Sequence, residues 1–285
     1  MPSMRSCVHQ RHRAVGWEVA RPNWTSRVPG VTMAGFDAAL PPTGNVRVVP
    51  HPAVMMILVF GDGLPVLADS AGRRPRRGSL VAGLGFGFGG SVSFAGGNVE
   101  CVQVRLSPVV ARAILGVSPA ELDGTIVALD NLWGWDTPRL SDQLAEKTSW
   151  QERFELVDGL LARRYAAAAA VDPEVAWAWE QIIASRGGAR VTRLATDIGW
   201  TRKRLWSRFR EQIGLPPKLA AKLIRFDHAA HRLVAGHAAA RVAAAAGYAD
   251  QSHLHRDVVA FAGVTPTAVA GEPFLLVDDV AWASY

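Results

Sequence analysis

Four polar side chains lie close together in the sequence, at positions from which they could recognise a nucleic acid. They supply amide, hydroxyl, imidazole and guanidinium groups, and they are Gln251, Ser252, His255 and Arg256. All four groups form hydrogen bonds, and the planar guanidinium of an arginine can bond guanine through two nitrogens. The set therefore predicts contacts to base edges and phosphates, with Arg256 as the strongest single candidate.

The apolar residues of the same stretch predict the helix that would hold these side chains. Leu254, Val258 and Phe261 are spaced i, i+4 and i+7, so they fall on one helical face and are expected to be buried. Gly247 is expected to end the Ala-rich helix before it, and the Thr-Pro pair at 265–266 to end the helix itself. A short polar helix after a tight glycine turn is the arrangement with which helix-turn-helix proteins enter the major groove.

A second unit of the same kind is predicted upstream, in residues 191–214. An apolar stripe is followed there by a Gly-Trp turn, and Thr201 is placed to cap the next helix. Leu205 and Phe209 predict the buried side of that helix. Its opposite side would carry the contact residues, which are Arg202, Lys203, Trp206, Ser207 and Arg210. Two roles stay open for the tryptophan, contact with a base or sugar and cover for the edge of the domain.

A long helix is predicted between the two units, because residues 218–235 contain no breaker and the prolines at 216–217 are acceptable in a first turn. Lys222 and Arg225 lie in this helix and could bridge phosphates. An internal ion pair is the alternative for Arg225.

The segment GYADQSHLHRDVVAFAGVTPTAV, residues 247–269, resembles the second helix-turn-helix of the AraC/XylS transcription regulators. The shared positions are Gly247, Tyr248, Asp250, Gln251, Ser252, His253, Arg256, Gly263, Thr265 and Pro266. The helix at 218–235 is similar to the linker helix of that family, with Phe226 where the family usually has Leu. The resemblance implies a DNA-binding regulator whose two recognition helices enter successive major grooves, about 34 Å apart.

Several positions depart from the family's pattern. Val258 stands where Phe is general, and Val259 and Ala260 stand where basic residues are common. In the upstream unit, Lys203 and Ser207 stand where Arg is commonly found. For the second unit, the resemblance therefore implies weaker packing of the buried side chain at Val258 and fewer phosphate contacts at Val259 and Ala260.

The basic residues are concentrated in the same part of the chain. Residues 172–270 hold 14 Lys and Arg against 8 Asp and Glu, while the whole chain holds 31 against 25. The excess is +6 in both cases, so the rest of the chain is balanced. A local basic excess is the footprint expected for phosphate contact.

The first half of the chain has a different pattern of residue types. Residues 17–106 contain short β-branched or apolar segments between glycine or proline turns, with a hairpin signal at Asp62-Gly63 and an exposed loop at 73–78. They predict a small antiparallel sheet or barrel. Residues 107–170 predict helices, the last of which would continue through the alanines at 166–170.

Three pieces of this half resemble the cupin-like amino-terminal domain of some of these regulators. They are HPAVMMILVFGDG at 51–63, QVRLSPVVARAILGVSPAEL at 103–122 and LDNLWG at 129–134. The predicted fold is thus α+β with two domains, a β-rich cupin-like domain followed by helices and an all-α double helix-turn-helix domain. The expected boundaries are 1–16 for a disordered basic leader, 17–170 for a sensor or dimerisation domain (β-rich to 106, helical from 107), 172–271 for the DNA-binding domain and 272–285 for a tail.

Three features of the first half could indicate other chemistry. GFGFGG at 85–90 fits a dinucleotide-binding spacing, but strand-like residues follow where a helix N-terminus is required, so glycines at a bend are favoured. His51 stands alone, whereas a metal site needs two or three His and a carboxylate, so a structural role is favoured. Glu100, Gln103 and Arg105 could line a small-molecule pocket or form an exposed face, and the exposed face is favoured. No catalytic residue, metal site or cofactor is expected.

Composition narrows the class of protein. A length of 285 residues predicts about two domains, and 49% hydrophobic residues suffice for packed cores. Cys7 and Cys101 are too far apart to suggest a disulfide framework. The first residues lack the apolar core of a secretory signal, and the longest apolar run, 53–60, is too short to cross a bilayer. The expected location is the cytoplasm, on the nucleoid.

The leading hypothesis is a sequence-specific transcription regulator without enzyme activity. Its expected partners are double-stranded DNA, a small-molecule effector or a second copy of the chain acting through the first half, and RNA polymerase if it is an activator; no membrane contact is expected. The alternative is a cupin-type metalloenzyme, or a DNA-modifying protein, that uses the same DNA-binding module. The effector, the operator and the sign of regulation stay open.

Overall fold

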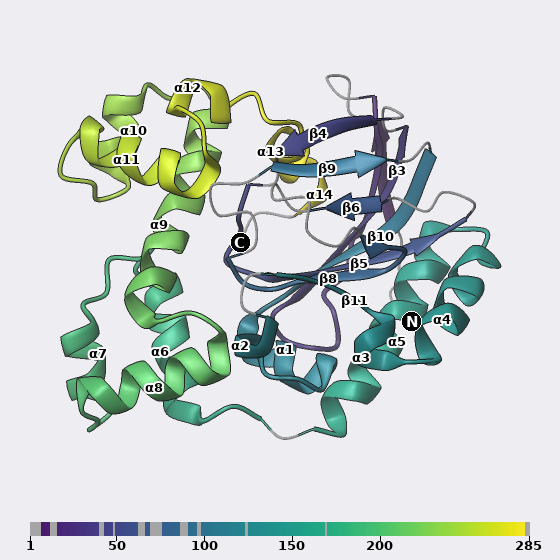
Figure 1. The fold of residues 1–285 in the computed structure, drawn as a ribbon, viewed down its shortest axis with the longest axis horizontal. Helices are drawn as coiled ribbons and strands as arrows, with labels where there is room; N and C mark the ends of the chain where they lie inside the picture. The colour runs from purple at the N-terminus through teal and green to yellow at the C-terminus, as the bar shows by residue number, and fades with distance from the viewer. Residues whose placement is uncertain are drawn as a thin grey trace.

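The computed structural model describes most of the 285 residues in two lobes, a β-rich lobe and a helical lobe (Figure 1). The described residues are 7–11, 16–39, 43–47, 49–61, 66–68, 76–85, 91–95, 98–122, 125–168 and 170–282. The hairpin signal at Asp62-Gly63 and residues 86–90 of the glycine motif lie outside these ranges.

A seven-stranded antiparallel sheet forms the centre of the β-rich lobe, in the order β1-β2-β3-β10-β5-β8-β11. Its strands are β1 (Cys7–Arg11), β2 (Glu18–Pro22), β3 (Val31–Ala39), β10 (Asn98–Leu106), β5 (Val54–Phe60), β8 (Leu80–Ala82) and β11 (Ile126–Ala128). A second sheet has the order β4-β9-β6-β7. Its strands are β4 (Thr43–Arg47), β9 (Ser91–Ala95), β6 (Val66–Ala68) and β7 (Arg76–Arg77). The predicted two-domain α+β fold with an amino-terminal antiparallel sheet is confirmed.

Strand β10 is central because β3 and β5 pair with it on either side. Its residues alternate between two covered faces of the sheet. Val102, Val104 and Leu106 belong to the main core, whereas Val99 and Cys101 belong to a smaller core on the opposite face. Since both faces are covered, a polar side chain on this strand is not automatically exposed to solvent.

Five helices follow or interrupt the sheet, and they are α1 (Pro108–Leu115), α2 (Pro119–Leu122), α3 (Asp130–Trp133), α4 (Asp136–Ala145) and α5 (Trp150–Ala166). The side chain of Trp150 lies so close to Gly35 of β3 that a Cβ there would come within 2.3 Å of the indole ring. Helix α5 therefore packs directly on the sheet, where Phe154, Val157 and Leu161 join the main core.

Three expectations for this half of the chain were wrong. Residues 7–11 of the expected disordered leader form β1, because they pair in register with β2. The expected loop at 73–78 contains β7, which pairs with β6. The last helix ends at Ala166 instead of continuing through 170.

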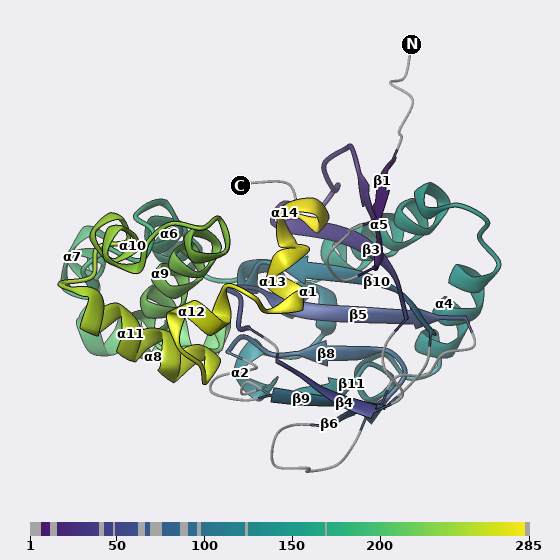
Figure 2. The same cartoon turned by 90° about the horizontal axis from the view of Figure 1, so that it is seen from above.

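The helical lobe contains α6 (Pro173–Ala184), α7 (Val191–Asp197), α8 (Arg202–Ile213), α9 (Pro217–Val234), α10 (Ala239–Ala245), α11 (Gln251–Ala262) and α12 (Pro266–Val269). Helix α9 runs between α6–α8 at one end of the lobe and α10–α12 at the other (Figure 1). After α12 the chain returns to the sheet through α13 (Pro273–Leu276) and α14 (Asp278–Ala281), as Figure 2 shows from above. Within the described ranges, no helix has both the length and the apolar character needed to span a membrane.

Candidate nucleic-acid interface

Helix α8 begins and ends where the sequence predicts. The Thr201 hydroxyl accepts a hydrogen bond from the backbone N–H of Arg204 at 3.1 Å, so the N-cap is confirmed. Gly214 ends the helix with φ of 97°, a left-handed conformation that glycine adopts without a Cβ penalty. Leu205 and Phe209 are fully buried, as predicted.

Helix α11 is built in the same way. Oδ1 of Asp250 accepts a hydrogen bond from the backbone N–H of His253 at 2.7 Å, and Gly263 ends the helix in the left-handed conformation. The predicted apolar face is confirmed, because Leu254, Val258 and Phe261 are all buried. Two capped helices therefore follow two tight turns, one in each half of the lobe.

The nine predicted contact residues all lie on the exposed sides of these two helices. On α8 they are Arg202, Lys203, Trp206, Ser207 and Arg210, and on α11 they are Gln251, Ser252, His255 and Arg256. The structure does not bring the two sets into one cluster; each set forms a separate surface on its own helix.

Trp206 projects from the exposed side of α8 with 46% of its surface accessible. The guanidinium carbon of Arg210 lies 5.4 Å from the centre of its ring, within the range of a cation–π contact. A neighbouring pair repeats the arrangement, since the guanidinium of Arg204 lies 4.4 Å from the ring of Trp200. The indole of Trp206 is thus exposed beside a positive charge, which suits stacking on a base or sugar as well as cover for the domain edge.

Helix α9 joins the two units through a continuous apolar contact. Phe226 is fully buried and stacks on Phe261 of α11, with ring centres 5.0 Å apart and planes inclined by 28°. The guanidinium of Arg225 donates to the carbonyl of Gly187 at 2.8 Å, which ties α9 to the turn after α6.

The two linker cations considered for phosphate contact both have partners inside the protein. Lys222 Nζ lies 3.4 Å from Oδ1 of Asp257, a buried carboxylate on α11. Arg225 bonds a backbone carbonyl and lies 5.6 Å from the Tyr248 ring, so its internal partner is not an acid. Asp257 was not singled out from the sequence, although its place one turn before Phe261 on the apolar side was a usable signal.

Arg208 reaches from α8 toward the start of α6 and not toward the predicted contact surface. Its guanidinium donates to both carboxylate oxygens of Asp172, at 2.9 and 3.0 Å, and to Glu211 at 3.0 Å. The hydrogen bond with Asp172 raises the pKa of this arginine further above its ordinary value. The side chain thus fixes α8 to the start of α6 and leaves the other α8 cations for a ligand.

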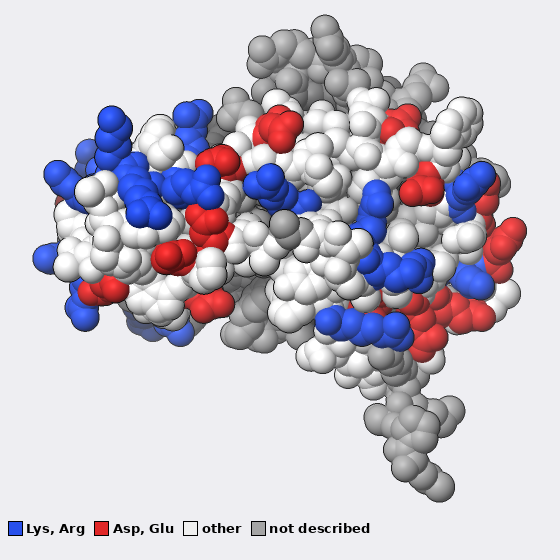
Figure 3. Space-filling model, turned by 90° about the horizontal axis from the view of Figure 1, so that it is seen from below, with Lys and Arg blue, Asp and Glu red and all other residues white. Residues whose placement is uncertain are grey.

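Basic side chains are spread over the helical lobe, as Figure 3 shows for one face. Residues 172–270 carry the net charge of +6 noted above, and the exposed Arg202, Lys203, Arg210 and Arg256 contribute four of the cations. This charge attracts an anionic polymer at a distance larger than any single hydrogen bond.

We expect Thr201→Ala to lower the free energy of unfolding by about 1 kcal/mol, because the substitution removes the only side-chain acceptor for the N–H of Arg204 recorded at this helix start. Urea unfolding followed by circular dichroism would measure the change. Thr201→Ser keeps the hydroxyl and should recover most of the loss; equal losses in the two variants would contradict a capping role.

A family model described as a helix-turn-helix domain matches residues 194–271. The match begins within α7 and ends after α12, so it includes α8, α9 and α11. A search of curated protein sequences finds no match.

Three solved structures are similar to this chain at low sequence identity. ToxT from Vibrio cholerae O395 has a TM-score of 0.49 and 11% identity, covering 87% of this chain and 99% of ToxT. The C-terminal domain of AraT, a response regulator from Geobacillus stearothermophilus, has a TM-score of 0.33 and 19% identity, covering 35% and 85%. The AraC-like transcriptional activator CuxR has a TM-score of 0.31 and 13% identity, covering 72% and 80%.

The matched residues coincide with the helices whose caps, buried faces and exposed polar faces are described above. The carboxyl-terminal part of this chain therefore contains a helix-turn-helix domain of the AraC type, in residues 194–271.

Proposed function

We propose that this protein binds a specific double-stranded DNA site through α8 and α11, placed in successive major grooves on one face of the duplex. The β-rich lobe would control this binding, by sensing an effector or by pairing with a second copy. The observation that carries the proposal is the repeated design of the two helices. Each is capped at its start, buries an apolar stripe and leaves a row of hydrogen-bonding side chains open to solvent.

The two helices would contribute different chemistry to the site. On α8, Arg202, Lys203 and Arg210 are cations and would bond phosphates or guanine, beside the exposed indole of Trp206. On α11, Gln251 and Ser252 are neutral and would pair with base edges. Arg256 is the one exposed arginine of α11 among the described residues, and so it would carry the charged contact of that half-site.

Three other basic residues support this assignment, because each of them already has an acceptor inside the protein. Lys222, Arg225 and Arg208 have acceptors inside the protein, at distances of 2.8 to 3.4 Å. They hold the helices in position, while the exposed cations remain free to exchange counterions for phosphates. Val259 and Ala260 add no charge to the exposed side of α11, which favours weaker binding by the second half-site.

The direct test is a fluorescence anisotropy titration of labelled genomic fragments with the full chain, in the presence of competitor DNA. We expect saturable binding to a subset of fragments, and an affinity that falls linearly with salt on a double-logarithmic plot. Binding that competitor DNA abolishes for every fragment would rule out a sequence-specific function.

Arg256→Ala is expected to weaken binding to the selected fragment by about 1–3 kcal/mol, roughly 5- to 150-fold, if the guanidinium reads a base. The same titration measures the change. Arg139→Ala is the matched control, because it removes an equally exposed arginine from α4 in the β-rich lobe. Equal small losses in both variants would show that Arg256 contributes only general charge.

A further inference from the structure

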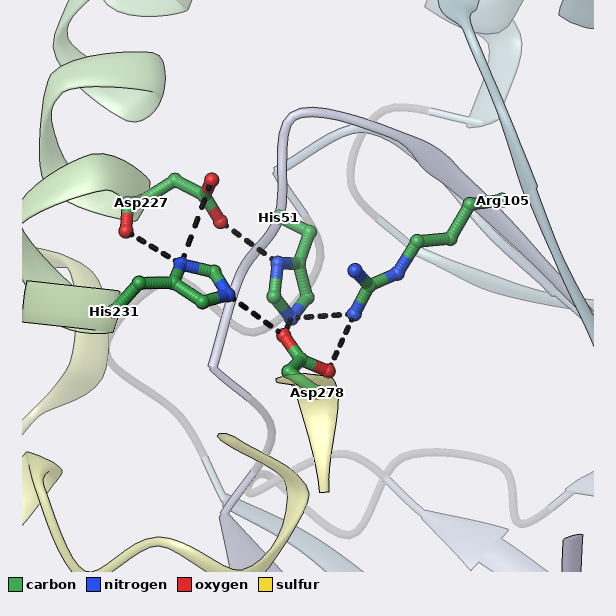
Figure 4. Close-up of polar contacts among 5 residues, drawn as sticks. All are labelled: His51, Arg105, Asp227, His231 and Asp278. Carbon is green, nitrogen blue, oxygen red and sulfur yellow. Dashed lines mark hydrogen bonds and ion pairs between the residues drawn. The ribbon is translucent and has the colours of Figure 1, made fainter. Parts of the chain in front are cut away.

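A buried polar network joins the two lobes at a place that neither recognition helix reaches. Five side chains take part: His51 and Arg105 from the β-rich lobe, Asp227 and His231 from α9, and Asp278 from α14 (Figure 4). Two of them that are in direct contact, His51 and Asp278, lie 227 residues apart in the chain. Within the described residues, no group of three or more His, Cys, Asp or Glu is arranged to hold a metal ion.

Asp278 lies at the centre of the network and contacts both lobes of the protein. Its Oδ1 accepts a hydrogen bond from Nη2 of Arg105 at 2.8 Å. Its Oδ2 lies 3.1 Å from Nε2 of His231 and 3.2 Å from Nε2 of His51. Asp227 closes the network from α9, with Oδ1 at 2.8 Å from Nδ1 of His51.

Because these side chains are buried, breaking one of their contacts costs more free energy than breaking a surface ion pair. The side chains of Asp278 and Arg105 are 4% and 8% exposed, and that of His51 is 11% exposed. A buried charge is costly without a partner, so losing one member removes a stabilising contact from charges that stay buried.

Burial and charged partners shift the pKa in opposite directions for two members of this network, His231 and Asp278. Burial alone would lower the pKa of His231, but the hydrogen bond with Asp278 and the charge of Asp227 raise it to about 9. Burial alone would raise the pKa of Asp278, but His51, Arg105 and His231 hold it well below its usual range. The histidine's contribution to stability is therefore full below its ordinary pKa near 6.5 and is lost as the pH rises through about 9.

Apolar contacts hold the same segment on the sheet. Val277, Ala281 and Trp282 are buried against the face of the sheet that carries Phe36 and Cys101. The guanidinium carbon of Arg105 lies 4.1 Å from the centre of the Trp282 ring, which gives this arginine a cation–π contact beside its ion pair. The polar network and the apolar patch thus share Arg105.

The geometry points to residues 270–282 acting as an intramolecular clasp, in which Asp278 locks the second helix-turn-helix unit and α9 to the β-rich lobe. The segment leaves α12 directly, and α9 carries both Asp227 and the contacts with α11, so the second unit is held at two points. A change at the sheet that moves Arg105 or His51 would therefore reach α9 and α11. The clasp would regulate the DNA binding proposed above, and this role rests on that proposed function. The contacts that form the clasp can be tested without it.

Hydrogen–deuterium exchange of the full-length protein tests the clasp without any DNA. Asp278→Asn keeps the shape of the side chain but removes its charge, and Arg105→Lys keeps a charge in the sheet but removes the guanidinium fork. We expect each variant to raise exchange about tenfold or more in peptides from α9 around 227–233 and from 273–282, with α8 unchanged. Asp142→Asn, the same change at an exposed position of α4, should alter neither peptide.

His231→Gln guards against a variant that simply fails to fold, because His231 is 31% exposed and its replacement is the milder one. It should raise exchange in the 273–282 peptide while circular dichroism stays that of the wild type. Unchanged exchange in that peptide for all three variants would overturn the clasp. Increased exchange together with no DNA binding by the wild type would instead retain the clasp and reject the proposed function.

Discussion

Phe226→Ala is expected to lower the free energy of unfolding by about 3–5 kcal/mol, the usual cost of removing a fully buried aromatic ring. Phe226 has no exposed surface and stacks on Phe261, so the cavity would open between α9 and α11. Urea unfolding followed by circular dichroism would measure the loss. Helix α11 packs on this contact, so under the proposed function the affinity for the selected DNA fragment should fall as well.

A matched variant separates lost volume from lost stacking. Phe226→Leu places the residue that the AraC/XylS linker helix usually has at this position, and it retains most of the apolar volume. It should recover more than half of the stability lost in Phe226→Ala. A loss below about 1 kcal/mol for the alanine variant would mean that the helices close over the site and that the stacked pair is not essential.

Gly187→Ala is expected to cost about 2–4 kcal/mol, by adding overpacking to backbone strain. Gly187 has φ of +77°, and a Cβ there would lie 2.1 Å from the carbonyl oxygen of Ala221 in α9. Because this oxygen belongs to a buried helix backbone, it cannot move aside without shifting α9. Thermal and urea unfolding of the full chain would measure the effect.

Gly199→Ala is the control for Gly187→Ala. Gly199 has a similar φ of +69°, but no atom lies within 4 Å of the Cβ position. Only the left-handed strain remains there, so the loss should be about 1–2 kcal/mol. Equal losses at the two positions would show that the turn after α6 moves away from α9 and relieves the overlap.

Helices α8 and α11 could be predicted from the sequence because their signals are local. Thr201 and Gly214 mark the ends of α8, and the spacing of Leu254, Val258 and Phe261 marks the buried face of α11. Each signal lies within a few residues of the feature that it predicts. The roles of the exposed residues on these helices stay predictions, since exposure alone assigns no base contact.

The residues of the clasp could not be predicted in the same way, because their partners are distant in sequence. The alternation of β10 favoured an exposed Arg105, but this expectation was wrong: the side chain is buried under α14, and its partner Asp278 lies 173 residues later. His51 was expected to be a lone structural residue, and it contacts Asp227 and Asp278. One usable signal was the apolar run of 274–282 around an aspartate pair, which is unusual for a free tail.

The start of α5 follows a local sequence signal, whereas its end does not follow the helix propensity of the alanine run. Helix α5 begins at Trp150, because Ser149 and Glu152 form a capping box there. Its hydrogen bonds also draw down the pKa of Glu152. The alanine run after 166 has a high intrinsic helix propensity, but the chain must turn there to enter α6, which begins at Pro173.

Because of the clasp, one core of the β-rich lobe is completed only late in the synthesis of the chain. Trp282 is translated after the whole helical lobe, yet it packs in a core built from Trp17, Phe36 and Cys101. That face of the sheet stays uncovered on the ribosome for the time needed to add about 180 residues, about 10 to 40 s at ordinary translation rates. During this interval the sheet is open to aggregation or to a chaperone, and the earliest-made lobe receives its last core residue only after the later lobe has emerged.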